Sequence, residues 1–315
     1  SPSLTVPEAK KGNERAEGPL SMNLLRETQE WLYQMILGGD YVDGAEIGST
    51  GFYPHDLIPN ALKRELDPIY INLEKQVKNK TGVTGSLGHR TYVNGHVDTL
   101  RVSIPQDGPC LLEAGLFFEG AFDRQDDSVA SGSVDAPDEF YMGHRGLFKY
   151  RTSGTADPYT TPDYVNGADF TIDFKLIKNG YTFNSNRDLS RFPSEVAYGQ
   201  RSVTGTIDCF FTSDAAIDLA YKDFSGMEFV IELAEGGYVT EFTFPNVKIM
   251  EDPEPDYSQS DDFVVVQFQF QAFQFVAGAD TYEMKVKITD KIANYPDGTG
   301  VGTLAPTWPN VAFTP

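Results

Sequence analysis

Residue types that build common functional sites are scarce in this chain. Its 315 residues include only two cysteines and four histidines. Two cysteines make no disulfide framework, and Cys110 and Cys209 both lie in apolar segments, which is typical of buried free thiols in a reducing compartment. No apolar run approaches the ~18 residues that a membrane-spanning helix needs, and residues 1–20 contain no apolar core of a secretory signal. We therefore expect a chain that is made in a cytoplasm and does not enter a membrane.

Positive charge is also in deficit. The chain has 25 Lys and Arg residues against 46 Asp and Glu residues, which gives a formal net charge of −21. Proteins that bind nucleic acid neutralise phosphates with Lys and Arg, and proteins that bind anionic membranes use the same residues. The charge therefore argues against both of these classes. It favours a chain that stays soluble through its own acidity.

Motifs of the common catalytic and metal sites are missing as well. The sequence has no G-x-S-x-G elbow, no G-x-G-x-x-G loop and no Walker loop. His89 and His96 flank a segment that we predict to be a turn, but a zinc site would need two more ligands that no Cys or His spacing supplies. The acidic segments 123–127 and 261–262 lack the ligand spacing and glycine of an EF-hand loop. We predict a protein without enzyme activity, metal or cofactor.

Strand patterns dominate what is present. The chain contains 22 Phe and 16 Tyr residues, which favour strands. Apolar and polar residues alternate with the period of a strand in many segments, and the apolar phase slips at Pro245, which predicts a bulge or a sheet edge. We therefore predict a mainly β protein. The predicted strands are 69–77, 100–104, 170–176, 203–211, 229–233, 239–249, 264–274 and 282–288.

Three segments have helical patterns. Residues 22–37 place apolar side chains near one face, Ser21 can cap this helix, and two glycines follow it. Residues 110–118 and 214–224 are predicted to form two shorter helices. Between the strands, residues 123–167 form a long insertion that packs against a neighbouring segment or stays partly mobile.

A short internal repeat indicates a duplication. V-T-G-S-L at 83–87 and V-T-G-T-I at 203–207 lie 120 residues apart, and each precedes a strand and a short helical candidate. We interpret this as a duplicated β module. The predicted domains are an N-terminal arm, helix and loop (1–64), a first β module with the 123–167 insertion (65–167), a second β module (168–292) and a C-terminal arm (293–315).

The stretch 181–212 contains the most distinctive sequence of the chain. An asparagine-rich turn, N-S-N-R-D, is followed by the segment G-Q-R-S-V-T-G-T. Its pattern G-x-R-x-V-T-G-T/S is met by Gly199, Arg201, Val203, Thr204, Gly205 and Thr206. This arrangement resembles the central hairpin of tail tube proteins from long-tailed, non-contractile bacterial and archaeal viruses. The resemblance extends over roughly residues 65–290.

This resemblance implies a fold and an assembly. Each module would be a β-sandwich with a short flanking helix, and the inner sheets of neighbouring subunits would join into a β-barrel around a lumen. Homo-oligomeric rings would stack into the virion tail, bridged by loops and the extended N- and C-terminal arms. Tape measure, baseplate or tip, and tail terminator proteins would be partners, and viral DNA would pass through without specific binding. Two modules per chain favour a trimeric ring, with a hexamer as the alternative.

Two groups of charged residues follow as candidate sites. The loop 187–201 carries charge in excess of any local core, so we expect it to contact another subunit through Arg187, Asp188, Arg191, Glu195 and Arg201. Carboxylates on the wet faces of inner strands would repel DNA from the lumen wall. The lumen candidates are Glu74, Asp173, Asp208 and Glu283, and the alternative is that they face outer solvent.

Two other classes remain open. A carbohydrate-binding or receptor-binding β-sandwich of a virion would stack sugars on loop aromatics such as Tyr141, Tyr159 and Tyr164. A secreted acidic hydrolase is the third class. The sequence argues against this class, because it contains neither a secretion signal nor a recognisable catalytic site.

Overall fold

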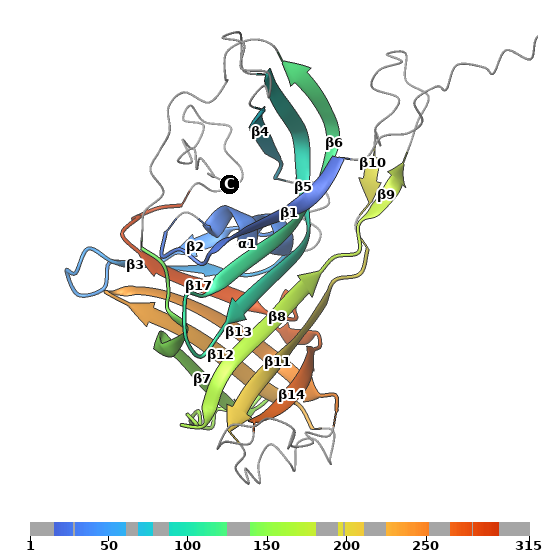
Figure 1. The fold of residues 1–315 in the computed structure, drawn as a ribbon. Coiled ribbons are helices and arrows are strands. Elements are labelled where there is room, and N and C mark those ends of the chain that lie inside the picture. Colours follow the sequence, from blue (N-terminus) through green and yellow to red (C-terminus); the bar gives the residue numbers. More distant parts are fainter. Residues whose placement is uncertain are drawn as a thin grey trace, which may run out of the picture.

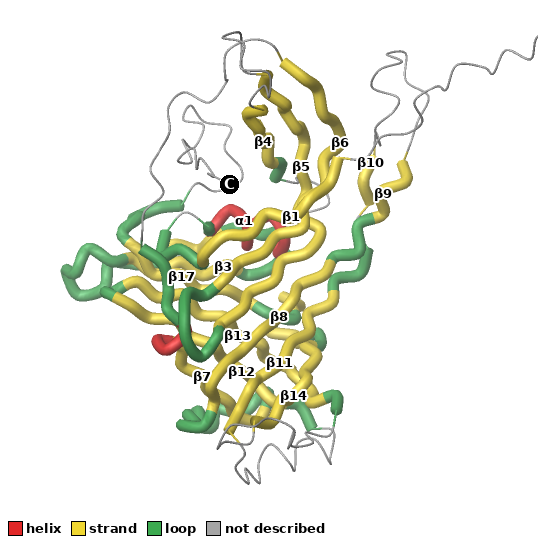
Figure 2. Tube along the Cα trace, in the orientation of Figure 1, coloured by secondary structure: helices red, strands yellow, loops and turns green. Residues whose placement is uncertain are grey.

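Antiparallel strands make up most of the protein (Figures 1 and 2). In the part of the chain that is described there is one α-helix, and no helix is long and apolar enough to cross a membrane. The mainly β prediction is therefore confirmed. The structure, a computed structural model, describes residues 16–27, 29–60, 69–77, 88–124, 139–180, 195–197, 199–210, 225–251, 265–278 and 280–295.

One layer of the fold, called layer I, contains six antiparallel strands. Its spatial order joins strands that are distant in sequence, because β5 pairs directly with β8 and β11 lies between β8 and β14. A further strand, β4 (Ile71–Val77), pairs with the first half of β5. The strands of layer I, in spatial order, are β1 (Ala16–Asn23), β6 (Leu111–Arg124), β5 (Gly88–Ile104), β8 (Val165–Asp173), β11 (Ser202–Phe210) and β14 (Val265–Ala272).

Layer II runs across layer I (Figure 1). It begins with β7, which shows that part of the 123–167 insertion is an integral strand. One long strand, β13, belongs to both layers, because its last residues pair with β14 while the rest pairs with β12 and β17. The strands of layer II, in spatial order, are β7 (Gly146–Thr152), β12 (Met227–Glu235), β13 (Tyr238–Ile249), β17 (Lys285–Asp290), β3 (Tyr53–Leu57) and β2 (Tyr41–Asp43).

Strand β13 contains a bulge at Pro245, in the part of the strand where it crosses from layer II to layer I. Met227 of β12 pairs with Val247, whereas Phe229 pairs with Phe244, so the register shifts across Pro245. A proline has no N–H to donate to a ladder, and an extra residue bends the strand that contains it. The predicted bulge is therefore confirmed.

Smaller elements complete the fold. The hairpin of β9 (Ile177–Gly180) and β10 (Glu195–Ala197) extends beyond the sandwich, at the same end as β4 and the upper parts of β5 and β6 (Figure 1). A second hairpin joins β15 (Phe275–Ala277) to β16 (Asp280–Tyr282). The 3-10 turn η1 (Gly143–Arg145) precedes β7, and the helix α1 (Glu30–Leu37) follows β1.

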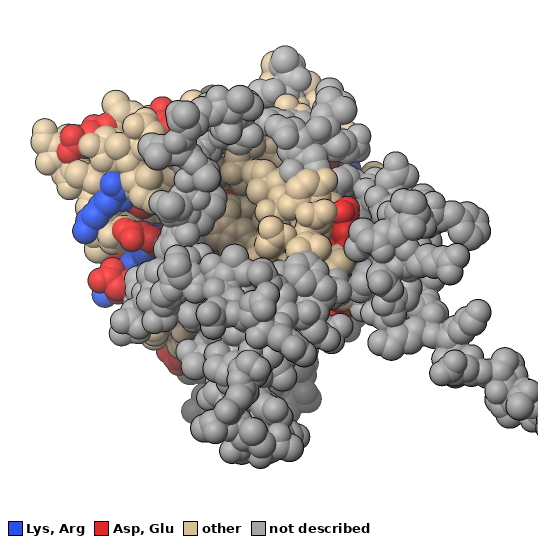
Figure 3. All heavy atoms as spheres, turned by 90° about the horizontal axis from the view of Figure 1, so that it is seen from above, with Lys and Arg blue, Asp and Glu red and all other residues tan. Residues whose placement is uncertain are grey.

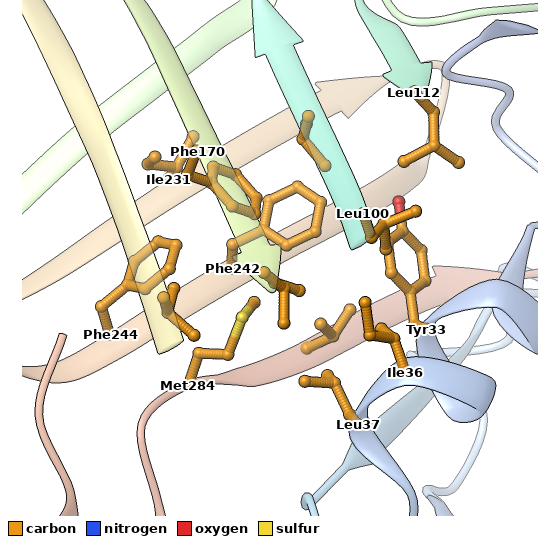
Figure 4. Close-up of a cluster of buried hydrophobic side chains, with 14 of the residues drawn as sticks. Tyr33, Ile36, Leu37, Leu100, Leu112, Phe170, Ile231, Phe242, Phe244 and Met284 are labelled. Carbon is orange, nitrogen blue, oxygen red and sulfur yellow. The ribbon is translucent and has the colours of Figure 1, made fainter. Parts of the chain in front are cut away.

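Aromatic side chains of the two layers meet in the core (Figure 4). Phe170 of β8 lies with its ring centroid 4.9 Å from Phe242 and 5.1 Å from Phe244, both on β13. Phe270 of β14 contacts Phe244 and Phe229 at 5.5 and 5.6 Å. All of these rings are at most 2% exposed. Edge-to-face pairs of this kind stabilise a β-sandwich beyond their burial alone.

Helix α1 closes one side of this core (Figure 4). Tyr33 packs edge-to-face on Phe242 at 5.7 Å, and Ile36 and Leu37 are fully buried. The helix ends at Gly38, whose N–H donates to the carbonyl of Gln34 and whose φ of 69° suits glycine.

The predicted helix over 22–37 is wrong in its first half. Residues up to Asn23 form β1, which pairs with β6 along all eight residues, and the helix begins only at Glu30. The apolar residues of this segment fit a helical face, but Pro19 can lie on an edge strand, where its missing N–H costs no ladder hydrogen bond. Pairing with a distant strand therefore determined the local structure.

The predicted helix over 110–118 is also wrong, because this segment lies in β6. Leu112, Ala114, Leu116 and Phe118 alternate into the core, each at most 4% exposed. At Gly115 an added Cβ would lie 2.4 Å from Thr99 Oγ1 on the adjacent strand, so the glycine allows β5 and β6 to pack closely.

The turn predicted between His89 and His96 is absent, since both residues belong to the single strand β5. Asn94 has a φ of 51°, which asparagine tolerates, and this local distortion sits within the strand. Two further predictions fall outside the described residues: the first repeat segment, 83–87, and the helix over 214–224. The division into two modules stays a prediction.

Candidate lumen surface

The outward face of layer I is almost entirely polar. Side chains alternate along each strand, so the residues between the core positions all point away from the sandwich. Directly opposed residues, such as Thr204 with Thr171 and with Gln271, carry this face from strand to strand. We call it the polar face. Its members are Glu17, Ser21, Asn23, Thr99, Arg101, Ser103, Glu113, Asp169, Thr171, Asp173, Ser202, Thr204, Thr206, Asp208, Lys248, Gln267, Gln269 and Gln271, with Pro19, Leu111, Phe117 and Phe210 as apolar exceptions.

The centre of the polar face is slightly hollowed. A shallow groove there is lined by five Thr and Gln side chains, by Gly205, by the carboxylate Asp169 and by the apolar residues Met250 and Phe270; the Thr and Gln residues are Thr171, Thr204, Thr206, Gln269 and Gln271. Hydroxyl and amide groups can exchange hydrogen bonds with water in any orientation. The groove is thus a largely polar, wettable surface with one carboxylate, Asp169, in its lining.

The face carries five carboxylates and two cations. The guanidinium of Arg101 is occupied by carboxylates on both neighbouring strands. Its Nε lies 2.9 and 3.0 Å from the two oxygens of Asp169, its Nη2 lies 2.7 Å from Asp169 Oδ2, and its Nη1 lies 3.4 Å from Glu113. These contacts raise the pKa of Arg101 above its ordinary value.

The second cation, Lys248, also has a partner. Its Nζ lies 5.7 Å from the ring centroid of Phe273. Two carboxylates of the face, by contrast, have neutral partners. Asp208 accepts a hydrogen bond from Gln267 at 2.8 Å, and Asp173 accepts one from the N–H of Lys175 at 2.9 Å. The face therefore presents net negative charge.

On the outward face of layer II, two ion pairs join β7 to β12. Lys149 lies 2.6 Å from Glu232, and Arg151 lies 2.8 Å from Glu228. Seen from the end that carries β4, basic and acidic side chains lie next to one another along one side of the molecule (Figure 3). Balanced pairs of both signs are usual for a surface that faces outer solvent. Both outward faces thus contain cross-strand ion pairs, and the polar face is distinguished by its Thr and Gln side chains and by its excess of carboxylates.

Two predicted site residues, Arg201 and Glu283, form one buried ion pair. The side chain of Arg201 is 7% exposed and that of Glu283 is 11% exposed, and Arg201 Nε donates to Glu283 Oε2 at 2.9 Å. Arg201 Nη1 also donates to the carbonyl of Leu37, and the guanidinium lies 5.6 Å from the ring of Phe174. Within one subunit this pair joins β11, α1 and the segment before β17. A neutralised, buried carboxylate cannot charge a lumen wall, so we remove Glu283 from that set.

The other candidates are placed as follows. Asp173 and Asp208 lie on the polar face, as described above. Glu74 is in β4 and Glu195 is in β10, but their side chains lie outside the described part of the structure. The remaining loop candidates, Arg187, Asp188 and Arg191, lie wholly outside it.

The tyrosines proposed to stack on sugars are engaged within the subunit. Tyr141 is fully buried, and its hydroxyl accepts a hydrogen bond from Thr240. Tyr159 donates to Glu228 at 2.5 Å while Arg151 covers its ring, and Tyr164 packs against the core. These residues give no support to a sugar-binding site.

Two edges of layer I lack a second strand among the residues that are described. The outer edge of β1 is one of them. The other is the first half of β14, because β13 reaches only its last residues, Phe270–Ala272, and Met250 reaches Gln269. Open edges present unpaired N–H and C=O groups, which can pair with another chain.

These features define a structural β-sandwich protein with an extended polar wall. Within the described ranges no group of three or more His, Cys, Asp or Glu side chains could hold a metal ion. The family model of the phage tail tube protein matches residues 1–272, so the chain belongs to that family. None of the curated proteins compared with the chain matches it. The protein is therefore a structural component of the virion tail that assembles with itself and with other tail proteins.

Proposed function

We propose that the protein polymerises as stacked rings into the hollow tail tube of a long-tailed, non-contractile virus, and that viral DNA is delivered through its lumen. The polar face of layer I would be the lumen wall. The observation that carries this proposal is the charge pattern of the polar face. Arg101 is bound by carboxylates and Lys248 lies against the ring of Phe273. Asp173 and Asp208, by contrast, are not neutralised by a cation among the interactions described.

Such a wall suits the passage of DNA. A free Lys or Arg that pairs with a phosphate would release counterions, and each such contact would retain the DNA. Carboxylates repel it instead. At physiological salt this repulsion reaches only about 8 Å from the wall, so it can line a channel without closing it. The Thr and Gln side chains between the carboxylates keep the wall wet.

The two open edges of layer I suggest how a ring would close. In our proposal, the outer edge of β1 pairs with the open half of β14 in the neighbouring subunit, which continues the sheet around the lumen. The protruding β9–β10 hairpin supports an inter-subunit role for the 187–201 loop, because Glu195 in β10 stands beyond the sandwich.

The stoichiometry and the remaining partners are also proposals. A trimeric ring is favoured if the chain is a duplicated module, and a hexamer is the alternative. Tape measure, baseplate or tip, and terminator proteins would bind the tube at its interior or its ends. The protein would be made in the host cytoplasm before it enters the virion.

Negative-stain electron microscopy of the purified chain tests the proposal directly. We expect rings or tubes with a stained central channel, and their rotational symmetry distinguishes three subunits from six. Particles that stay discrete monomers over a wide range of protein and salt concentrations would contradict the proposal. A subnanometre map of the tube would then test whether the polar face lines the channel.

A further inference from the structure

A buried histidine connects three distant parts of the chain. His55 of β3 is fully buried. Its Nδ1 lies 2.7 Å from Asp43 Oδ1 of β2, and its Nε2 lies 2.7 Å from the carbonyl oxygen of Ile292, which follows β17. Asp290, at the end of β17, is also fully buried and lies 3.4 Å from the same Nε2.

The two short contacts require a proton on each ring nitrogen. A carboxylate oxygen and a carbonyl oxygen both accept hydrogen bonds and neither donates. A neutral imidazole has one N–H, so one of its nitrogens would face an oxygen lone pair at 2.7 Å. The imidazolium has two N–H groups and satisfies both contacts. The geometry therefore selects the charged form of His55.

Ionisable groups on each packed element act on this histidine. Burial opposes the charge, but hydrogen bonds and charges from Asp290 and Asp43 outweigh burial and raise the pKa of His55 above its ordinary value of 6.5. The phenols of Tyr41 and Tyr295 remain neutral, since burial raises the pKa of each. Helix α1 contributes Glu30, whose charge acts on these neighbouring phenols and raises their pKa values further.

The segment that His55 holds is the one that leads toward the C-terminal residues. Tyr295 stacks on the imidazole with ring centroids 4.0 Å apart, and its hydroxyl donates to Asp290. Its N–H donates to Asp43 at 3.3 Å, and the N–H of Ile292 donates to Asp290 at 2.7 Å. The carboxylates that hold His55 thus also bind the backbone and side chains of residues 292–295.

We propose that His55, Asp43, Asp290 and Tyr295 form a proton-dependent latch that fastens the segment 291–295 to the β2–β3 edge of layer II. With two protons on the ring, the latch is closed. Loss of one proton leaves a ring nitrogen facing an acceptor and leaves the buried carboxylate of Asp290 and the partly exposed carboxylate of Asp43 without a cation between them. The segment 291–295 is then released, while the backbone pairing of β3 with β2 and β17 holds the sandwich together.

Nuclear magnetic resonance of the histidine ring tests the protonation state. In protein labelled with ¹⁵N at histidine, we expect both ring nitrogens of His55 to carry protons at pH 6.5 and the ring to titrate above that pH. His96 is the internal reference, because it is also buried and its Nε2 lies 3.0 Å from the carboxylate of Glu119. A neutral His55 ring at pH 6.5 would overturn the proposal.

Hydrogen exchange tests the release. After correction for the intrinsic pH dependence of exchange, the amides of Ile292 and Tyr295 should lose up to about tenfold protection for each pH unit between 6.5, the ordinary pKa of histidine, and the raised pKa of His55 in the closed latch, and should lose no more above it. The variant His55→Gln should show low protection at every pH, and His96→Gln should behave as the wild type does. The amides of β12 and β13 report whether each variant is folded. Equal wild-type protection of the segment from pH 6 to pH 9 would overturn the latch.

This inference does not depend on the tube. The latch lies within one chain, so its titration can be measured on subunits and on assembled particles alike. A chain that forms no tubes but shows a doubly protonated His55 would contradict the proposed function and leave the latch intact.

Discussion

Asp169 of β8 binds the guanidinium of Arg101 on β5 through both of its oxygens. Both side chains are substantially exposed, at 28% and 52%, so the pair contributes little to stability. Its effect is on charge. The pair, together with Glu113 on the other side, occupies the most exposed cation of the polar face. We infer that these carboxylates keep Arg101 from binding a phosphate.

The first prediction follows from this masking. Asp169→Asn removes the bidentate partner of Arg101 and should make assembled particles bind double-stranded DNA. Every phosphate that a released guanidinium neutralises adds about 0.9 to the slope of the logarithm of affinity against the logarithm of salt. Co-sedimentation of labelled DNA with the particles, measured over a salt series, gives this slope.

Asp208→Asn is the matched control for this experiment. It removes the same charge from the same face, but the partner of Asp208 is the neutral Gln267, so no cation is released. We expect this variant to bind DNA no better than the wild type. Equal binding by the two variants would mean that net charge alone matters and that masking of Arg101 does not.

The second prediction concerns the buried pair of Arg201 and Glu283. Glu283→Gln leaves the guanidinium buried without a counter-charge, and loss of one partner of a buried pair costs about 3–5 kcal/mol. Glu232→Gln breaks the pair with Lys149, in which both side chains are 24% exposed, and should cost less than about 1 kcal/mol. Urea unfolding followed by circular dichroism measures both. Similar costs for the two variants would contradict the structural role assigned to Arg201.

The sequence predicted most strands of the sandwich, because burial on one face produces an alternation that needs no knowledge of the partner strand. The prediction failed where pairing with a distant strand determines whether a segment is a strand or a helix. The segment before Glu30 fits a helix locally, yet pairing with β6 makes Ala16–Asn23 a strand. The segment after Cys110 has apolar residues on both sides of Gly115, so its period was ambiguous until β5 was known to lie against it.

The candidate sites were predicted less well, since charge pairs form between residues that are far apart in sequence. Asp173 and Asp208 were found because they occupy polar positions of predicted strands. The pairing of Arg201 with Glu283 cannot be recognised from the sequence around either residue. Because the pair is buried, neither residue is an exposed charge of the loop or of the lumen wall, as the sequence had suggested. The contact of His55 with Ile292 spans 237 residues and was missed for the same reason.

The third prediction tests ring closure. Cysteines placed at Ser21 of β1 and at Gln267 of β14 should be joined between subunits by a short thiol-reactive crosslinker, because the proposal brings these edges together. The native Cys110 and Cys209 are buried and contribute little background. Denaturing gels should show a ladder that ends at the number of subunits in the ring.

The control for the crosslinking places one cysteine on the other layer. Lys149→Cys combined with the cysteine at Ser21 should give no ladder, since the outward face of layer II is not part of the proposed contact. Crosslinking that is confined to single chains in the first variant would show that β1 and β14 do not meet between subunits.

The fourth prediction concerns the 187–201 loop. Deletion of residues 188–198 should leave a folded β protein that no longer polymerises, because the charged loop is proposed to contact another subunit. Circular dichroism reports the fold, and electron microscopy reports the assembly. Replacing the same residues with a Gly-Ser linker of equal length separates the loss of side chains from the loss of length. Normal tubes from the deletion variant would show that the loop has another role.

The last prediction is the pH dependence of stability that the latch implies. A histidine whose folded pKa is raised contributes stability that is fully present below its unfolded value of about 6.5 and is lost as the pH rises through the folded pKa. The free energy of unfolding of the wild type should therefore exceed that of His55→Gln most at low pH. The excess should shrink as the pH rises, by about 1.4 kcal/mol for each unit by which the pKa is raised. The series must stop below pH 10, the ordinary pKa of tyrosine, because burial raises the pKa of Tyr295 and ionisation would then favour unfolding. Taking the difference between the two proteins cancels the titration of the many carboxylates that they share. A difference that grows with pH would mean that the fold binds His55 in its neutral form.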